Sequence, residues 1–378
     1  MNNAVETKEK KQKADREPLF HITKRAYMPL GKSIAVRAGA IVAALIVCGI
    51  VTILLTGDNP LSIYATMLEG AFGTPTITWM TLHNTAILLL ISLAVAPAFK
   101  MKFWNTGAEG QVLIGCLMSA ILMLNLGGKI PDWLLIILIF VCGIAAGAIW
   151  GIIPAFFKAM FGTNETLFTL MMNYVAIQLI EFFLKIADKS GSNTVGPDKL
   201  SHGWLPIIGG QKYLLNILIV LLFTVLMYIY LTYSKHGYEI SVVGESANTA
   251  RYIGINVKKV IIRTMALSGA VCGLTGVLLV AGSSHSIDSN LAGGNGFTAI
   301  MVAWLAKFNP FMMVLASLLI VVLGRGAGEV SSVFGLNKSF SDILTGIILF
   351  FIIGCEFFIN YKINFNIRSG HKSAKEAE

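Results

Sequence analysis

Charged side chains are scarce in this chain of 378 residues, because only 13% of them are charged and 55% are hydrophobic. An ordinary soluble domain carries about 25% charged residues, so this composition excludes a water-soluble globular protein. Uncharged runs recur along almost the whole chain, and several approach the ~20 residues that cross a ~30 Å hydrocarbon core as a helix. We therefore expect an all-α, polytopic membrane protein that lies in a lipid bilayer.

Signatures of catalysis and of metal binding are also missing. No G-x-x-x-x-G-K-[ST] motif occurs, so the chain cannot hydrolyse a nucleotide through a P-loop. A membrane-bound enzyme or an assembly scaffold has no positive support, because no Ser/His/Asp or Cys/His arrangement has a recognisable context. The cysteines match no metal motif and no disulfide framework, and they lie inside apolar runs: Cys48, Cys116, Cys142, Cys272 and Cys355. We expect no bound cofactor and no metal.

The positive net charge does not indicate a nucleic acid partner. The net charge is +9, but the Lys and Arg residues do not form a folded basic face with interleaved aromatic residues. They are distributed by side of the membrane instead. With the N-terminus inside, 22 of the 29 Lys and Arg residues fall in cytoplasmic segments and 7 in external ones. Since cytoplasmic loops carry the excess of positive charge, we predict that both termini are cytoplasmic.

Uncharged stretches predict about ten membrane-spanning helices, an even number that agrees with termini on one side. The eighth and ninth stretches are short, and Asn309-Pro310 between them is a turn signal, so one broken hairpin is an alternative to two helices. The first apolar run begins near Ala38 after a long polar tail and is predicted to be a retained span, not a signal peptide. The stretches are 38–56, 79–99, 107–126, 133–153, 167–185, 214–233, 264–282, 294–306, 311–324 and 342–360.

The chain is predicted to contain one membrane domain with two polar tails. Residues 1–33 form a basic cytoplasmic tail that we expect to be disordered, residues 34–361 form the transmembrane domain, and residues 362–378 form a second cytoplasmic tail. Within the membrane domain, residues 186–213 are expected to form a long extracytoplasmic loop, and residues 234–263 a long cytoplasmic loop. No segment is long enough to hide a soluble domain.

Glycines spaced four residues apart predict close packing of two spans. Gly143, Gly147 and Gly151 repeat along the fourth span, and Gly269 and Gly273 repeat along the seventh. Small residues at this spacing let the backbone of another helix approach closely. We interpret both ridges as packing surfaces inside one bundle rather than as a dimerisation motif.

The long cytoplasmic loop contains a short predicted helix. Ser246 is a suitable N-cap and Gly254 a left-handed stop, which leaves about two turns of helix between them. Ala247, Ala250 and Arg251 lie on adjoining faces, where small side chains would let a partner approach the backbone. A plain connection between two spans is the alternative. The residues considered for docking are Gly244, Ser246, Ala247, Ala250, Arg251 and Gly254.

A glycine-rich turn joins the second and third spans. It contains Asn105, Gly107, Glu109 and Gly110 at the membrane boundary. Irregular backbone at membrane depth is tolerated only where protein or water covers it, so the turn is expected to be buried in the bundle. Glu109 either orders the turn by accepting backbone N–H bonds or carries a proton.

Polar side chains in the fifth span are candidates for a solute route. Asn173, Tyr174 and Gln178 lie within an otherwise apolar helix, and polar groups at this depth are costly unless they meet partners or water. Amide groups both donate and accept hydrogen bonds, which suits a polyhydroxylated or heterocyclic solute. Hydrogen bonding between helices is the alternative. Asn84 in the second span could line the same route.

Four segments together resemble the permease subunits of bacterial ABC importers in the branched-chain amino acid, ribose and nucleoside class. The likeness is greatest to the nucleoside, or simple sugar, permeases. Trp104-Asn-Thr-Gly-Ala-Glu-Gly-Gln111 is similar to the family's Phe-Asn-Ile-Gly-Ala-Glu-Gly-Gln. The other segments are Asn164 to Tyr174, Gly244 to Ile255 followed by Ser268-Gly-Ala, and Gly294 to Ile300. Trp104 and Thr106 depart from the family pattern.

This resemblance implies a subunit of ten helices in the bacterial plasma membrane that moves a small polar solute, with a nucleoside favoured over a simple sugar or a branched-chain amino acid. It implies a cytosolic ABC ATPase that binds ATP and docks on Gly244 to Ile255. It further implies a second, homologous permease, so that a heterodimer forms, and an extracytoplasmic substrate-binding lipoprotein. A proton-coupled secondary transporter, with Glu109, Glu181, Asp288 or Glu356 as the relay, is the alternative of another class.

Overall fold

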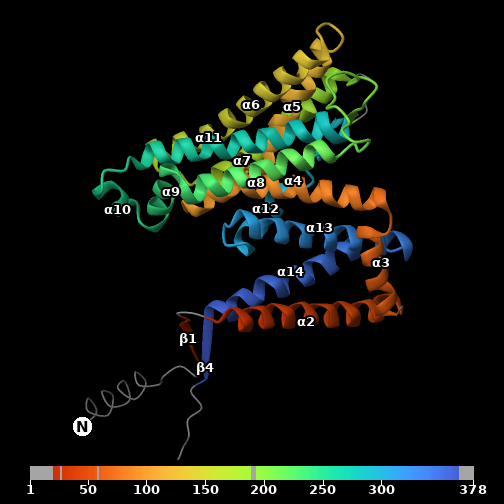
Figure 1. Cartoon of the computed structure of the whole chain (residues 1–378), viewed down its shortest axis with the longest axis vertical. Helices are drawn as coiled ribbons and strands as arrows, with labels where there is room; N and C mark the ends of the chain where they lie inside the picture. Colours follow the sequence, from red (N-terminus) through yellow and green to blue (C-terminus); the bar gives the residue numbers. More distant parts are fainter. Residues whose placement is uncertain (1–19, 26–27, 58, 189–192, 366–378) are drawn as a thin grey trace, which may run out of the picture. The chain divides into compact units, whose positions relative to one another are not determined.

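The computed structural model describes residues 20–25, 28–57, 59–188 and 193–365, and Figure 1 labels its helices and strands. The chain divides into two compact units. Unit 1 comprises Met1–Ile63 and Ser339–Glu378, and unit 2 comprises Tyr64–Lys338. Within the described residues, nine helices are long and apolar enough to cross a membrane. The expectation of an all-α, polytopic membrane protein is therefore confirmed.

Unit 1 is built from the two ends of the chain. Its helices are α2 (Leu30–Thr56) and α14 (Lys338–Asn360), and its strands β1 (Phe20–Lys24) and β4 (Tyr361–Phe365) pair antiparallel. Arg37 of α2 donates hydrogen bonds to Glu356 Oε1 of α14 from Nε at 3.0 Å and from Nη2 at 2.5 Å. Because a charge inside an apolar span needs a partner, this ion pair holds the two helices together.

The pairing of β1 with β4 brings the two ends of the described chain together in unit 1. β1 directly precedes the first span and β4 directly follows the last, and the Arg25 N–H donates to Asn360 O at 2.8 Å. The described residues contain nine candidate spans instead of the ten predicted, and the cytoplasmic location of the termini stays a prediction. The sequence predicted no strand in either tail. Residues 1–19 and 366–378, which include most of the tail expected to be disordered, lie outside the described residues.

Unit 2 is a helical bundle, and its predicted spans are found with shifted ends. The α5 and α8 boundaries agree closely with the sequence, whereas α6 and α11 extend beyond the uncharged stretches. The helices are α3 (Pro60–Phe72, from Tyr64 in this unit), α4 (Pro75–Lys100), α5 (Ala108–Leu126), α6 (Asp132–Phe161), α7 (Glu165–Ala187), α8 (Leu214–Tyr233), α9 (Lys235–Glu245), α10 (Ala247–Tyr252), α11 (Val257–Leu279) with the π-turn Val280–Ser284, α12 (Asn295–Leu305) and α13 (Pro310–Val333).

The core of unit 2 is formed where α4, α5, α6 and α11 pack together. Every residue of α4 from Thr85 to Phe99 is buried. A Cβ on Gly147 of α6 would overlap the backbone of Gly269 and Gly273 of α11, so the two helices approach with backbone against backbone. The glycine ridges are thus packing surfaces inside one bundle, and that prediction is confirmed.

The predicted eighth and ninth spans differ from each other in the structure. α12 has 11 residues, which cover only about 16 Å at about 1.5 Å per residue and cannot cross a ~30 Å core. α13 has 24 residues and is long enough, so the ninth span was predicted too short. Asn309 forms the predicted turn, because its Oδ1 accepts hydrogen bonds from the N–H groups of Phe311 and Met312.

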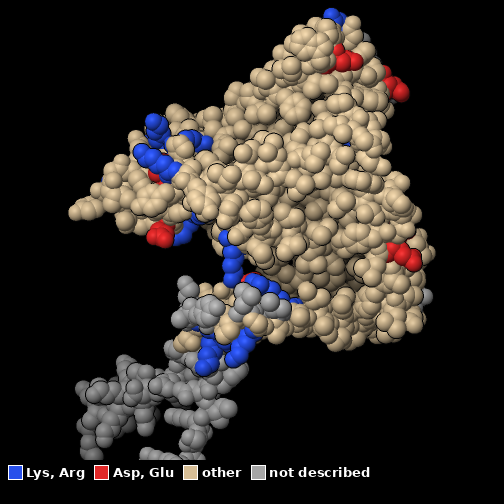
Figure 2. All heavy atoms as spheres, in the orientation of Figure 1, with Lys and Arg blue, Asp and Glu red and all other residues tan. Residues whose placement is uncertain are grey.

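The loop between α7 and α8 covers the opposite end of unit 2 from α9 and α10. Strand β2 (Thr194–Val195) pairs with β3 (Ile287–Asp288), which follows α11. The ring of Trp204 stacks on His285 with centroids 4.0 Å apart. Figure 2 shows charged side chains at the ends of the bundle and almost none on the surface between them, as a span through hydrocarbon requires.

Replacing Gly147 with Val should destabilise unit 2, because the new side chain would meet the α11 backbone, which cannot rotate away. We expect a loss of about 3 kcal/mol, the upper part of the range for overpacking, measured by denaturant unfolding of the purified protein. Gly324→Val in α13 is the matched control, since nothing lies within 4 Å of its added Cβ. Equal stability of the two variants would contradict this account of the packing.

Candidate functional site

The carboxylate of Glu109 joins two helices of unit 2. Glu109 lies in the first turn of α5, and its side chain reaches the start of α12. Its Oε1 accepts a hydrogen bond from the Gly294 N–H at 2.7 Å, and its Oε2 accepts one from the Gly296 N–H at 2.7 Å. The first N–H groups of a helix have no partner inside the helix, and a negative charge is favourable at this end. Glu109 therefore caps α12 from a neighbouring helix.

Glycines make this approach possible. A Cβ on Gly296 would overlap the backbone and the carboxylate of Glu109. Gly293 and Gly294 have φ of +62° and +77°, a conformation that other residues rarely adopt. The sequence suggested that Glu109 accepts N–H bonds from its own turn, whereas the donors belong to α12. The hydrogen bonds agree with the structural interpretation of Glu109, and its role as a proton carrier stays a prediction.

Two asparagines hold the turn between α4 and α5. Asn105 Oδ1 accepts a hydrogen bond from the Gly107 N–H at 3.0 Å, and its Nδ2 donates to Ser268 Oγ of α11 at 3.2 Å. Asn173 of α7 accepts from the Gly110 N–H at 2.8 Å and donates to Thr106 O at 2.8 Å. The turn is buried as predicted, and it links α5, α7 and α11.

Asn173 was expected on a solute route, but both ends of its amide bind the chain itself. Asn173 is only 3% exposed, so burial as well as these two bonds keeps its amide from a solute in this conformation. These contacts are those of the alternative interpretation, hydrogen bonding between helices. A direct contact of Asn173 with solute stays a prediction that these bonds do not favour.

Tyr174 and Gln178 lie on a different face of α7 from Asn173. They are four residues apart, so they share one side of the helix, and both are exposed, Tyr174 by 59%. They also lie near the middle of this 23-residue helix, at the depth where a polar side chain in contact with lipid is costly. The exposed side chains around them are apolar, among them Met171, Val175 and Leu179, so Tyr174 and Gln178 are the polar positions on a mainly apolar face of α7.

Asn84 is not grouped with these two residues. It is exposed on α4, next to His83, whose buried ring stacks on Tyr213 with centroids 4.7 Å apart. The main neighbours of α4 are α8, α11, α12 and α13, whereas α7 packs mainly against α5 and α6. A single route lined by both Asn84 and the α7 pair is therefore not formed within unit 2 alone.

The predicted short helix exists as α10, between α9 and α11. Ser246 Oγ accepts a hydrogen bond from the Thr249 N–H at 3.2 Å, and Gly254 has φ of +85°, so the predicted cap and stop are confirmed. A Cβ on Gly244 would overlap the carbonyl oxygen of Lys100. The segment is thus pressed against the end of α4 and the turn that leads to Glu109.

Ala250 faces inward, which corrects the expectation that it offers a small surface to a partner. It is fully buried and belongs to an apolar cluster with Met101 and Phe103 of the turn and Val257 of α11. Ala247 is half-buried against the same cluster. The exposed face of α10 and its C-terminal turn carries Arg251, Tyr252 and Ile253, and Tyr252 is 93% exposed.

The sequence identified Glu109 but missed its partners, because Gly294 and Gly296 lie more than 180 residues away. The backbone of the glycine run from Gly293 to Gly296 is held by this carboxylate, at the Gly294 and Gly296 N–H groups. The exposure of Tyr252 was also missed, since only the small residues of α10 were considered. Among the described residues, no group of three or more His, Cys, Asp or Glu side chains could hold a metal ion.

Comparison with known proteins identifies the family. Residues 77–353 match the permease component of the branched-chain amino acid transport system, and this range contains the Glu109 turn, α7, α10 and α12. The chain belongs to this permease family. It is therefore the membrane-spanning, multi-pass subunit of an ABC transporter, as the resemblance implied.

Three relatives cover most of the permease. It is 30% identical to the glucose ABC transporter permease protein TsgB13 of Haloferax volcanii, over 85% of this chain and 88% of the relative. It is also 30% identical to the guanosine ABC transporter permease protein NupP of Bacillus subtilis, over 80% and 88%. With the nucleoside ABC transporter permease protein NupB of Lactococcus lactis subsp. cremoris, the identity is again 30%, over 87% and 91%.

Glu109→Ala should destabilise the permease, because it leaves two buried N–H groups of α12 without an acceptor, at about 1–3 kcal/mol each. Glu109→Gln keeps one acceptor oxygen and should lie between Ala and the wild type. Thermal unfolding of the purified protein measures this order. A proton carrier predicts another result, namely a Gln variant that unfolds like the wild type but no longer supports uptake.

Proposed function

We propose that this permease is the transport subunit of an ATP-driven importer of nucleosides, and that a separate ATPase drives it through the exposed face of α10. The observation that carries the proposal is the position of α10. Its inner face packs on the turn between α4 and α5, and that turn leads directly to Glu109 and α12. A push on α10 from outside the bilayer would thus reach helices at membrane depth.

The contacts supply a continuous route for this motion. Ala250 of α10 packs with Met101 and Phe103, Asn105 of the same turn binds Ser268 of α11, and Asn173 fastens the turn to α7. Packed cores rearrange between discrete states rather than deform continuously. ATP binding on the partner would therefore shift the bundle between two packings, and a solute biases this equilibrium only by its different affinity for the two.

Two independent observations favour a nucleoside as the solute: the names of the relatives and the side chains exposed on α7. Two of the three relatives named above transport guanosine or nucleosides by their names, and the third transports glucose. The exposed pair on α7 combines an aromatic ring at Tyr174 with an amide at Gln178, and these groups can stack on a heterocyclic base and exchange hydrogen bonds with it. A simple sugar is the second candidate, because of the glucose-transporter relative.

The importer is further proposed to contain a second, homologous permease and an extracytoplasmic substrate-binding lipoprotein. Two polar side chains on the exposed face of α7 support the second permease, because Tyr174 and Gln178 would otherwise face lipid near the middle of a span. A cavity between two permeases would give these side chains water and solute. ATP is expected to be bound by the ATPase and not by this chain.

The docking proposal can be tested on the surface of α10. Tyr252→Ala together with Arg251→Glu should reduce co-purification of the ATPase at least tenfold, since exposed aromatic and Arg side chains carry most of the energy at interfaces. Tyr238→Ala on α9 is a control of the same residue type. Unchanged co-purification with both α10 substitutions would contradict the assignment. Ala250→Trp is unsuitable for this purpose, because it would disrupt the buried cluster.

The solute can be tested by uptake of labelled inosine into cells that express the complete importer. We expect unlabelled guanosine to compete, and ribose, glucose and leucine not to compete. Gln178→Ala should lower uptake without reducing the amount of folded permease, because its side chain has no contact inside the bundle that the fold requires. Competition by glucose but not by guanosine would identify a sugar permease instead. Uptake that persists without the ATPase and stops when the proton gradient collapses would support a secondary transporter.

A further inference from the structure

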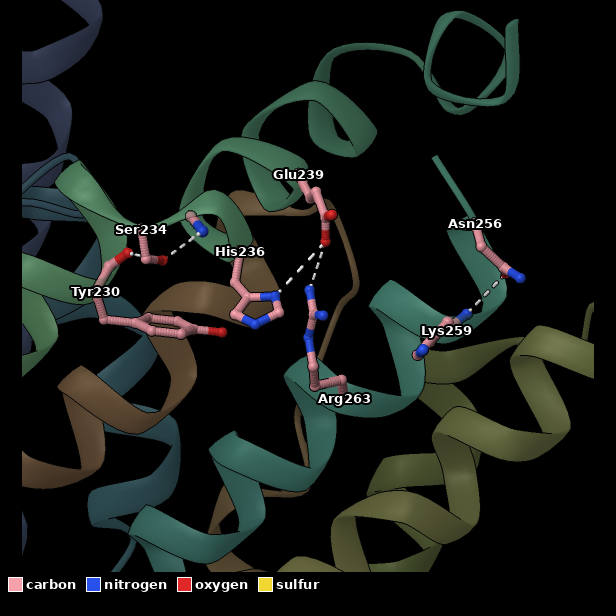
Figure 3. Close-up of polar contacts among 8 residues, drawn as sticks. Tyr230, Ser234, His236, Glu239, Asn256, Lys259 and Arg263 are labelled. Atoms are coloured by element: carbon pink, nitrogen blue, oxygen red, sulfur yellow. Dashed lines mark hydrogen bonds and ion pairs between the residues drawn. The ribbon is translucent and has the colours of Figure 1, made fainter. Parts of the chain in front are cut away.

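A pocket of about 270 Å³ lies beside α9 and the start of α11, away from the α7 face and from α12. It is lined by Lys235, His236 and Glu239 of α9, by Asn256, and by Lys259 and Arg263 of α11. Figure 3 shows the side chains of His236 and Arg263 directed toward Glu239. Its volume is far above the ~15 Å³ that one water needs, so a group of several atoms fits.

Positive charge exceeds negative charge in this pocket. Lys235, Lys259 and Arg263 are basic, and Glu239 is the single carboxylate in the lining. Arg263 Nη2 donates to Glu239 Oε2 at 2.6 Å, and this hydrogen bond holds the pKa of the Glu239 carboxyl below its usual value. Glu239 is thus ionised at neutral pH and is occupied by Arg263. Both lysine side chains are exposed and form no ion pair within the described residues.

The helix ends around the pocket add to its positive potential. α9 begins at Lys235 and α11 begins at Val257, and neither helix has an acidic residue in its first turn. Lys235 and Lys259 therefore lie in the first turns of these helices, where they are repelled by the positive end of the helix dipole. This end of a helix favours anions. A bound anion would relieve both repulsions at once, and the phosphate group has the charge and the acceptor oxygens for this role.

The pocket lies at the level of the lipid headgroups. It lies just after the end of α8 at Tyr233 and beside the first two turns of α11, where two candidate membrane spans begin or end. Tyr233 and Tyr238 beside it are 73% and 61% exposed, and such tyrosines are enriched at the level of the lipid headgroups. Figure 2 shows Lys and Arg gathered over this end of the bundle. Phospholipid headgroups place their phosphates at this level.

We propose that the pocket between α9 and α11 is a binding site for the headgroup of an anionic phospholipid. Lys235 and Lys259 bind the phosphate from two sides, and Arg263 donates to it while it remains paired with Glu239. Because α9 leads into α10, a lipid bound here also fixes the base of the segment that we propose as the ATPase docking site. The lipid site itself does not depend on that function, nor on the solute.

The test uses the purified full-length permease in detergent and follows its thermal unfolding. Three additions are compared: short-chain phosphatidylglycerol, phosphatidylcholine with the same chains, and inorganic phosphate. We expect saturable stabilisation by phosphatidylglycerol alone. The double substitution Lys235→Gln and Lys259→Gln should weaken this binding about twenty-five-fold, about fivefold for each lysine near an anionic headgroup.

A matched control removes the same charge from the same end of unit 2. Lys258→Gln with Arg251→Gln alters two exposed residues outside the pocket, and Lys258 Nζ lies 3.9 Å from Met160 Sδ instead. This variant should keep wild-type affinity for phosphatidylglycerol. Native mass spectrometry provides a second measurement, in which the control but not the pocket variant should retain co-purified anionic lipid.

Three results would each overturn the proposal. Equal stabilisation by phosphatidylcholine would show that charge is not recognised. Equal loss of affinity in the control variant would show a diffuse effect of net charge rather than a pocket. Stabilisation by inorganic phosphate as strong as that by phosphatidylglycerol would identify a site for a free anion, not for a lipid.

Discussion

The hydrogen bonds from the start of α12 to the Glu109 carboxylate are the constraint on which the rest of unit 2 depends. α12 is too short to cross the membrane, and its first turn packs on Glu109 of α5, so the N–H groups of Gly294 and Gly296 would otherwise lack partners. Water cannot satisfy them at membrane depth. One carboxylate from α5 satisfies two of them and supplies the negative charge that this helix end favours. The turn before α5 must therefore hold its position, and Asn105 and Asn173 hold it.

This constraint separates the structural and the functional sides of the bundle. The polar groups that point inward, from Asn105, Glu109 and Asn173, are all used in contacts within the chain. The polar groups of Tyr174 and Gln178 point outward from the same region and are exposed. Adjacent positions on α7 thus lie in different environments, because Asn173 is bonded inside the bundle and Tyr174 is exposed.

Much of the fold of unit 2 could be predicted from the sequence, because hydrophobic runs and local capping and glycine patterns determine it. The spans followed from their lack of charge, the packing of α6 on α11 from glycines at spacing of four, and the ends of α10 from Ser246 and Gly254. Burial within a short polar helix could not be predicted in the same way, since Ala250 and Tyr252 differ in environment only through the turn that α10 packs against. The partners of Glu109 and the pairing of β1 with β4 depend on contacts across almost the whole chain, and local patterns do not report those.

The pairing of α2 with α14 has a consequence for how the protein is made. Arg37 and its partner Glu356 are 319 positions apart, so α2 is joined to a helix that the ribosome makes much later. Until α14 is made, the Arg37 guanidinium has no carboxylate of α14 to pair with. Unit 1 can therefore assemble only after the whole of unit 2 has been synthesised, and a chain truncated before α14 lacks this pairing.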